Sequence, residues 1–256
     1  MVSKPVATGS DPPPEVEDPS IHYPDTDDEP LAETEFQFNP LTEMVHALRV
    51  HYEDRPDVYV AGDMFVYYRM NVVAANVAPD VFVVFGVDKR TRRSYMVWRE
   101  GKAPDFVMEI TSASTYARDI GEKRDIYAAI GVTEYWRFDP QRECFDPPLA
   151  GERLADGSYE PIPVGEDSEG ILRGYSARLG LDICVRDDLL RLYDPINRSW
   201  LRNLSEAEAA RVEAEAARVE AEAARAEKVA ALRAMQERNR ELEALLRQHG
   251  ISPDTE

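Results

Sequence analysis

Apolar residues in the middle of the chain occur in short runs separated by turns. Residues 79–85 and 105–110 are nearly continuous apolar runs, a pattern typical of strands buried on both faces. Branched and aromatic residues predict further strands at 58–61, 64–68, 94–98 and 133–138. Short hairpins are expected between residues 144 and 200, around 159–162 and 190–193. The middle of the chain is therefore predicted to form a sheet of many short strands.

Two segments of the same region have helical patterns. The first helix is expected to start near Thr42, with the Thr42 side chain as its cap. The second runs from Tyr116 to Ile130 and ends at Gly131, a residue suited to a helix C-terminus. Strands alternating with helices predict an α/β (α+β) core.

Residues 205–249 contain almost no glycine or proline, and the unit Ala210–Ala216 repeats seven residues later. This pattern predicts a helix of about 65 Å and favours a coiled coil. Its apolar positions form two rows in shifted register, one of Val212, Val219 and Ala226 and one of Leu232, Met235, Leu242 and Leu246, with Asn239 at a core-like position. A solitary charged helix stabilised by i,i+4 Glu–Arg pairs is the alternative. The leucines favour a homo-oligomer.

Charge divides the chain of 256 residues further. Of the formal net charge of −19, residues 1–40 carry −9, and their acids and prolines predict a disordered arm. The core at 41–204 carries −6, and the helix at 205–249 and the tail at 250–256 carry −2 each. This balance argues against a protein that coats nucleic acid electrostatically.

No segment approaches the roughly 20 apolar residues of a membrane-spanning helix. Residues 1–5 lead into acids and prolines, so no signal peptide is expected. Cys144 and Cys184 stand 40 residues apart without a partner motif, which is typical of a reducing compartment. We therefore expect a cytoplasmic protein.

Two acids interrupt apolar strands. An unpaired ionised carboxylate at Asp80 or Glu109 would be costly to bury, so each must be paired, neutralised or bound to metal. Two carboxylates that converge at a strand edge form a site suited to Mg²⁺. The alternative is that these acids lie at strand ends, where they cap helices or pair with Arg124 and Arg137.

The helix after Glu109 carries Asp119, Lys123 and Tyr127, which share one face at i,i+4 spacing. Lys123 would approach the two carboxylates if this helix packs across the strand ends. An ordinary surface ion pair is the alternative. A basic turn follows the Asp80 strand and is suited to contact phosphates, unless it is only a solvated turn; it contains Lys89, Arg90, Arg92 and Arg93.

Three stretches follow one another in order: 79–84, 104–115, and a third formed by Asp119, Lys123, Tyr127 and 131–136. Together they resemble the bacterial Uma-two family of restriction endonucleases, within the PD-(D/E)xK superfamily. The resemblance covers about residues 41–200. It implies a restriction-endonuclease-like core with a mixed central sheet flanked by helices, and it makes Asp80 and Glu109 the two acids of the family.

The superfamily pattern places a lysine two residues after the second acid, where this chain has Thr111. The resemblance implies that Lys123 replaces it from the following helix. Asp119 also resembles a family position, and orienting Lys123 is the simplest account of its role. Glu43 would match a further acid that supports the metal in some superfamily members.

The leading hypothesis is a Mg²⁺-dependent or Mn²⁺-dependent endonuclease that hydrolyses DNA. Asp80, Glu109 and the Ile110 carbonyl would hold the metal, Lys123 would position or activate water, and the basic turn would hold the DNA backbone. A second hypothesis is an inactive nuclease-fold module that acts through its C-terminal helix. Hydrolysis by a nucleophilic Ser112 or Ser114 is a third.

Overall fold

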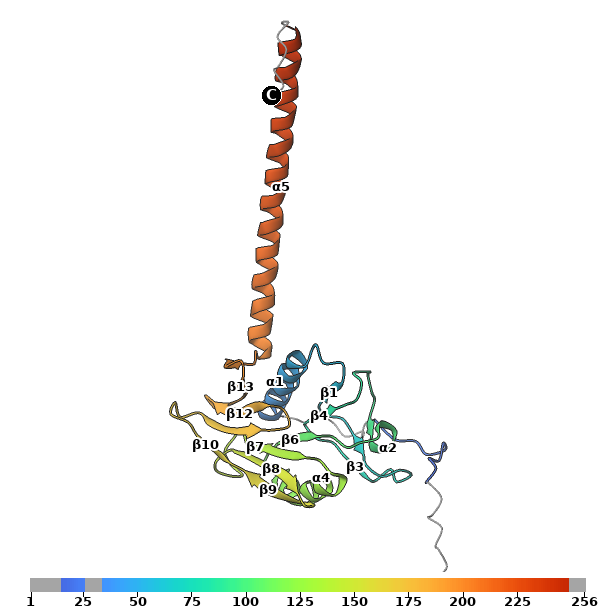
Figure 1. The fold of residues 1–256 in the computed structure, drawn as a ribbon. Helices are drawn as coiled ribbons and strands as arrows, with labels where there is room; N and C mark the ends of the chain where they lie inside the picture. The colour runs from blue at the N-terminus through green and yellow to red at the C-terminus, as the bar shows by residue number, and fades with distance from the viewer. Residues whose placement is uncertain (1–14, 26–33, 249–256) are drawn as a thin grey trace, which may run out of the picture. The chain divides into compact units, whose positions relative to one another are not determined.

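Six strands form a mixed sheet at the centre of the fold, in the order β1-β4-β6-β7-β8-β9 (Figure 1). In the computed structural model, which describes residues 15–25 and 34–248, β6 and β7 run parallel and the other neighbours in this sheet run antiparallel. The strands are β1 (Val58–Ala61), β4 (Val81–Phe85), β6 (Phe106–Ile110), β7 (Glu134–Phe138), β8 (Leu149–Ala155) and β9 (Ser158–Ile162). The two predicted buried strands, at 79–85 and 105–110, are therefore the neighbours β4 and β6.

Helices cover both faces of this sheet (Figure 1). On one face, Leu48 of α1 (Glu35–His51) joins a buried cluster with Val81 and Met108. On the other face, Tyr127 of α4 (Arg124–Ile130) packs in a second cluster with the intervening residues of the strands. Because side chains alternate between faces along a strand, the sheet has two separate cores. The predicted fold class, a mixed sheet flanked by helices, is confirmed.

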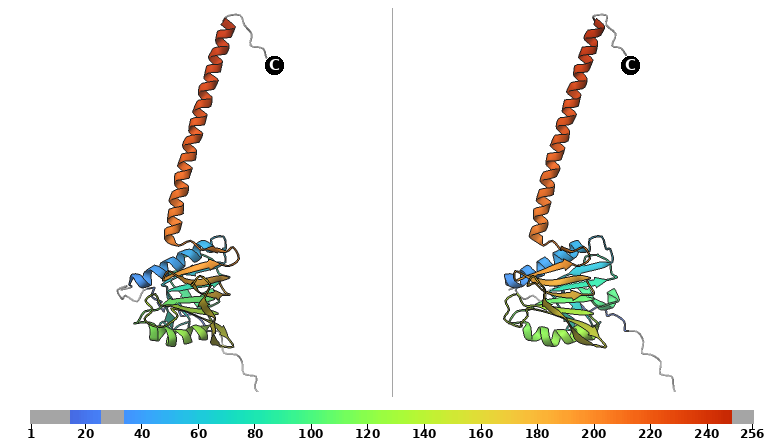
Figure 2. Two further views of the ribbon diagram at one scale, coloured as in Figure 1. Left: turned by 90° about the vertical axis from the view of Figure 1, so that its left-hand side faces the viewer. Right: turned by 60° about the vertical axis from the view of Figure 1, so that its left-hand side comes forward.

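A second, antiparallel sheet packs on the α1 side of the central one, as the turned views of Figure 2 show. Trp136 of β7 fills the space between the two sheets. A Cβ at Gly151 or Gly174 would lie 2.6 Å or 2.8 Å from the Trp136 ring, so both positions require glycine. The strands of this sheet are β10 (Val164–Glu166), β11 (Leu172–Ser176), β12 (Leu181–Arg186), β13 (Leu189–Asp194) and β14 (Ser199–Trp200).

A three-stranded sheet in the order β3-β2-β5 supports the N-terminal segment. Its strands are β2 (Val66–Tyr67), β3 (Asn76–Val77) and β5 (Tyr95–Met96), and the short helix α2 (Val97–Glu100) follows directly. The segment 94–98, predicted as one strand, thus ends as a helix.

The prediction of a disordered arm over residues 1–40 is wrong for residues 15–25 and from residue 35 onward. Tyr23 is buried against Tyr67 and Trp98, and the Tyr67 hydroxyl donates a hydrogen bond of 2.6 Å to the Pro24 carbonyl. The composition suggested disorder because this segment has few apolar residues, but its one tyrosine enters an aromatic cluster contributed by the folded core. The rest of the arm before residue 34, at 1–14 and 26–33, lies outside the described residues, as do residues 249–256.

Helix α1 begins at Glu35, so the prediction of a start at Thr42 is also wrong. Pro40 lies inside the helix, and the Thr42 hydroxyl donates to the Phe38 carbonyl one turn back instead of capping the helix. A proline inside a helix removes a backbone hydrogen bond, so Pro40 disfavours a helix that begins before it. Met44, Ala47 and Leu48 are buried further along α1, and their packing stabilises the helix despite the proline.

The chain divides after Asn203 into two units, Met1–Asn203 and Leu204–Glu256. In the second unit, α5 (Leu204–Gln248) is a single uninterrupted helix of 45 residues, which confirms the predicted long helix (Figure 2). All large apolar residues of α5 are exposed within the described structure. None of the described helices is both long and apolar enough to cross a membrane.

Candidate active site

The register of β4 against β6 brings Asp80 and Glu109 together. Val81 pairs with Met108 in this antiparallel ladder, so continuing it by one residue sets Asp80 opposite Glu109. Opposite residues project from the same face of a sheet. That face carries α4, since Val107, two residues before Glu109, packs with Tyr127. Two acids far apart in the sequence thus become neighbours on the helix-covered face.

A close approach of the chain after β1 fixes the backbone at Asp80. The Asp63 N–H donates a hydrogen bond of 3.2 Å to the Asp80 carbonyl. A Cβ at Gly62 would lie only 2.4 Å from the same carbonyl oxygen. Gly62 therefore allows β1 to pass beside the acid.

Glu109 is buried and has two donors from one helix face. The Lys123 Nζ lies 2.8 Å from Oε2, and the Tyr127 hydroxyl donates a hydrogen bond of 2.6 Å to Oε1. Glu109 is 1% exposed and the Lys123 side chain 11%. The predicted approach of Lys123 to a strand carboxylate is therefore present, and the alternative of a surface ion pair does not describe it.

Asp119 also faces Lys123. Its Oδ1 lies 3.3 Å from the Lys123 Nζ, and neither of its buried carboxylate oxygens accepts a hydrogen bond within the described structure. Asp119 and Lys123 bound a π-helical turn, η1 (Asp119–Lys123), between α3 (Tyr116–Arg118) and α4. Such turns are frequent at functional sites.

Tyr135 supports this turn, and sequence reasoning missed it. Its hydroxyl donates a hydrogen bond of 2.8 Å to the Asp119 carbonyl. Tyr135 lies on β7, on the same sheet face as Glu109. The strand alternation could have placed the ring on this face, but a contact between a side chain and a helix backbone leaves no sequence signal.

The Asp80 side chain holds the backbone of the neighbouring strand. Its Oδ2 accepts a hydrogen bond of 2.5 Å from the Ile110 N–H. In an extended strand the N–H and C=O of one residue point to the same side, so the Ile110 carbonyl is expected to face Asp80 as well. The three predicted metal ligands therefore belong to neighbouring positions at one end of the β4–β6 ladder.

The Lys123 ammonium pairs with Glu109 and Asp119, and the charge of Asp80 also acts on it. Burial and the charge of Glu109 raise the pKa of Asp80 well above its ordinary value. Burial also raises the pKa of Glu109, against the opposing charge of Lys123. Burial opposes the charge on Lys123, but the charges of Glu109 and Asp119 outweigh it and raise the pKa of Lys123. Lys123 thus keeps its proton, and acid exceeds base at the site.

The alternative partners for the strand acids are occupied elsewhere. Arg124 and Arg137 both pair with Glu152 on β8, each with an N–O distance of 2.9 Å. The hypothesis that these arginines neutralise Asp80 and Glu109 is therefore wrong. Lys123 neutralises Glu109 instead, and Tyr127 donates a hydrogen bond to it.

The donor chemistry of the site fits a hard divalent cation. Two carboxylates and a backbone carbonyl are oxygen ligands of the kind that Mg²⁺ prefers, and the excess of negative charge favours a cation. Across residues 15–25 and 34–248, no cluster of three or more His, Cys, Asp or Glu side chains is arranged to hold a metal. Such an ion would also compete with Lys123 for the Glu109 carboxylate.

The basic turn is not brought to these acids. Asp80 precedes β4 and the turn follows it, so the five residues of the strand separate them by about 16 Å. The basic turn, which is predicted to hold the DNA backbone, therefore lies at the other end of β4 from Asp80. An extended strand places the turn before it and the turn after it at opposite ends of the strands of the sheet.

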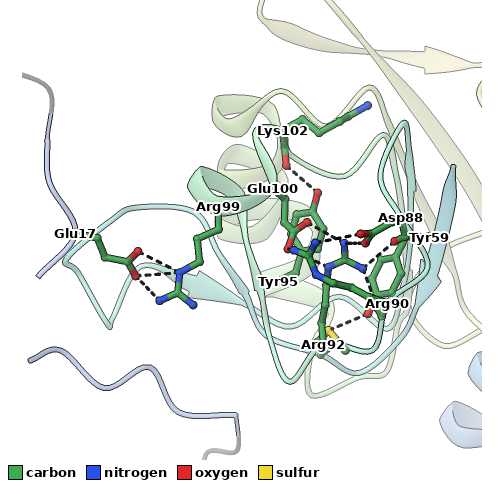
Figure 3. A network of polar contacts seen from close by, with 10 residues as sticks. Glu17, Tyr59, Asp88, Arg90, Arg92, Tyr95, Arg99, Glu100 and Lys102 are labelled. Carbon is green, nitrogen blue, oxygen red and sulfur yellow. Dashed lines mark hydrogen bonds and ion pairs between the residues drawn. The ribbon is translucent and has the colours of Figure 1, made fainter. Parts of the chain in front are cut away.

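Two cations of the turn, Arg90 and Arg92, are engaged within the fold (Figure 3). The Arg92 side chain is 4% exposed, stacks 4.3 Å from the Tyr59 ring centroid and pairs with Asp88 and Glu100, each at 2.8 Å. Arg90 pairs with the same two acids.

Lys89 and Arg93 are both exposed but differ in their contacts. Lys89 donates to the carbonyls of Tyr52 and Glu53. Arg93 is 90% exposed and lies 3.7 Å from Asp25. Of the three arginines predicted to contact DNA, Arg93 has the most exposed side chain.

The remaining candidates from the sequence lie outside the carboxylate cluster. Glu43 is on α1 and borders a small hollow with Leu190 and Leu192 of the second sheet, on the face opposite Glu109. Ser112 and Ser114 bond to each other at 2.9 Å in the loop after β6. The described structure records no histidine bonded to either serine.

Comparison with known proteins finds a family match for most of the chain. Residues 15–181 match the Uma2 family, described as "Putative restriction endonuclease". The chain belongs to this family. The Uma2 match includes Asp80, Glu109, Asp119 and Lys123, and it ends at the first residue of β12, before α5.

A solved structure titled as that of a "putative nuclease" from Anabaena variabilis ATCC 29413 also matches. The two sequences are 12% identical. The match covers 55% of this chain and 75% of the Anabaena chain, with a TM-score of 0.40. A search of curated protein sequences finds no match. Uma2 membership therefore rests on the family match, and the start of that match at residue 15 agrees with the packing of residues 15–25 on the core.

Proposed function

We propose that the chain is a metal-dependent endonuclease that hydrolyses phosphodiester bonds in DNA. The observation that supports this most is the convergence of Asp80, Glu109 and Lys123 on one face of the central sheet. Uma2 membership agrees with a nuclease activity. Among reactions of nucleic acids, hydrolysis of a phosphodiester uses carboxylate-bound metal and a fixed cation.

Asp80, Glu109 and the Ile110 carbonyl would hold Mg²⁺ or Mn²⁺. The ion, when bound, polarises the scissile phosphate and lowers the pKa of its water. The chain keeps the ligands in place through Tyr127, which donates to Glu109, and through the Ile110 N–H, which donates to Asp80.

Lys123 acts as a cation rather than a base. Its raised pKa keeps the ammonium protonated, so it positions water or offsets the charge that develops on the phosphate. Asp119 orients this ammonium from the same helical turn. The basic turn has no catalytic role in this scheme, because Arg92 is engaged in ion pairs within the fold.

Cleavage of supercoiled and linear DNA tests the proposal. Wild-type protein is expected to cut in Mg²⁺ or Mn²⁺ and to lose activity with a chelator, whereas Asp80→Ala is expected to be inactive. Glu134→Gln is a matched control, since Glu134 is a buried acid of the same sheet but bonds to Ser176, on the opposite face. Equal DNA cleavage by wild type and Asp80→Ala in both metals would contradict the nuclease proposal.

A second function is favoured by α5, whose apolar residues are exposed along the helix. We propose that α5 joins copies of the chain into a homo-oligomer. Removal of residues 204–256 is expected to lower the solution mass to that of a monomer, and an unchanged mass would exclude α5 as the contact. If Mg²⁺ binding and cleavage were both absent, this assembly function alone would remain.

A further inference from the structure

The distal part of α5 has an apolar row of a different kind from the rest of the helix. Leu232, Met235, Leu242 and Leu246 are separated by three, seven and four residues, and Asn239 divides the middle interval into four and three. Their exposed fractions, 57%, 64%, 47% and 36% in that order, leave this row open to solvent. The alternating spacing of three and four is that of coiled-coil positions a and d.

We infer that this row pairs with the same row of a second copy, parallel and in register. The inference rests on the proposed self-association and adds the orientation, the register and the extent of the contact. Leu232, Asn239 and Leu246 occupy a positions, and Met235 and Leu242 occupy d positions.

Asn239 favours the parallel arrangement. In a parallel pair each a residue faces the same residue of the other copy, so two Asn239 amides meet and bond to each other. In an antiparallel pair a positions face d positions, and Asn239 would lie against Met235 or Leu242 with its amide unpaired. A buried amide without a partner is unfavourable.

The charges beside the row favour the same arrangement. Arg238 takes position g and Glu243 takes the following position e. In a parallel dimer these two positions lie across the contact from each other, so the symmetric pair contains two attractive Arg238–Glu243 contacts between the copies. The nearest antiparallel alignments place Arg238 beside Leu245 or beside another Arg238.

The contact is confined to the distal end because neither register suits the proximal part of α5. Continuing the distal register toward Leu204 sets Arg211, Arg218 and Arg225 at successive a positions, where each faces its own copy. Such like charges in the seam oppose pairing.

The alternative proximal register, with Val212 and Val219 at d, also has unfavourable charges. It places glutamates on both flanks of the seam, at Glu213, Glu215, Glu220, Glu222 and Glu227. In a parallel dimer Glu215 faces Glu220 of the other copy, and Glu222 faces Glu227. The proximal helices therefore stay apart while the distal ends pair.

Charge-reversal variants test the register. The dimer Kd of each full-length variant is measured by sedimentation over a range of concentrations. Glu243→Arg turns two attractive contacts into repulsive ones and is expected to raise the dimer Kd about tenfold. Adding Arg238→Glu to the same chain restores the contacts with reversed sign and should bring the Kd back. Glu237→Arg, at the outward position f, is the matched control and is expected to leave the Kd within about twofold.

Oxidative cross-linking tests the orientation. Leu232→Cys in a Cys144→Ser background, with the buried Cys184 retained, is expected to form a disulfide between copies, because residue 232 faces itself only in a parallel pair. In an antiparallel pair the two positions lie at least about 15 Å apart along the helix.

Three outcomes separate the claims. A monomer at every concentration would overturn self-association itself, together with this inference. A dimer without the disulfide, or without rescue by the double exchange, would overturn the parallel register alone. A dimer that is both cross-linked and rescued supports the inference.

Discussion

At the scale of single residues, the raised pKa of Asp80 links its ionisation to stability. The folded chain holds the Asp80 proton more tightly than the unfolded chain does, so the fold loses stability as pH rises through the interval between the two pKa values. This cost is fully present above the folded pKa and absent below the unfolded value of about 3.9. The ligand arrangement is thus maintained at the expense of stability while no metal is bound.

Asp80→Asn is therefore expected to stabilise the metal-free protein at neutral pH. The amide oxygen still accepts the Ile110 N–H, while the charge is removed. Each kcal/mol recovered raises the melting temperature by about 2–4 °C in a protein of this size. Thermal melts without divalent metal should show the gain at neutral pH and none near pH 3. A lower melting temperature for Asp80→Asn at neutral pH would contradict the account.

Lys123→Met is expected to have the opposite effect. The folded-state pKa of Lys123 is raised, so its stabilisation is fully present below its unfolded pKa of about 10.4 and is lost only as pH rises through the higher folded value. Removing one partner of a buried ion pair costs about 3–5 kcal/mol. Denaturant unfolding at neutral pH measures the loss.

Arg118→Met provides the control on the same helical segment. Arg118 is 59% exposed and pairs with Glu122 at 3.4 Å, so its loss is expected to cost at most about 1 kcal/mol. If the two variants were equally stable, Lys123 would not be the cation that holds the buried acids.

The sequence was sufficient for the main acids and for Lys123 because their signals are local. A carboxylate inside an apolar run is conspicuous at Asp80 and Glu109, and i,i+4 spacing places Asp119 with Lys123. The engagement of Arg92 within the fold was not predictable, because its partner Glu100 lies eight residues further along the chain on another element. Local charge density does not show which cations fold back onto acids.

At the scale of elements, the turn between β4 and β5 is a structural unit. Arg92 donates from all three guanidinium nitrogens, to Glu100, to Asp88 and to the Arg90 carbonyl, at distances of 2.8–3.0 Å. These bonds fix the turn against α2. The hydrogen bonds of Arg92 therefore stabilise the fold.

Arg92→Ala is expected to lower the free energy of unfolding by about 1–3 kcal/mol, because it leaves the Glu100 side chain, which is 9% exposed, with Arg90 as its remaining partner. Its effect on DNA affinity in the folded protein should be small. Arg93→Ala, which removes a 90% exposed side chain, should leave stability unchanged within about 0.5 kcal/mol. Unfolding curves paired with DNA binding check both. A stable Arg92→Ala protein with weakened DNA binding would contradict this structural role.

Strand positions were predictable where apolar runs were continuous, as in β4 and β6. The start of α1 was not, because Pro40 is a strong local signal for a helix start and the burial that overrides it comes from the sheet. The packing of residues 15–25 was missed for a similar reason, since Tyr23 gains its partners, Tyr67 and Trp98, only in the folded chain.

At the scale of the whole molecule, the net charge of −19 and the engaged basic turn leave little cation for a nucleic-acid backbone. Bound metal would supply that charge at the carboxylates. The central claim is therefore that Asp80 and Glu109 together hold a divalent ion.

Calorimetric titration of the full chain with Mn²⁺ tests this claim most directly, because it requires no knowledge of the substrate. Wild type is expected to bind one ion, Asp80→Asn to bind at least about tenfold more weakly, a loss of about 1.4 kcal/mol, and Glu134→Gln to bind like wild type. Equal affinity of wild type and Asp80→Asn for Mn²⁺, or no binding by wild type, would contradict the account.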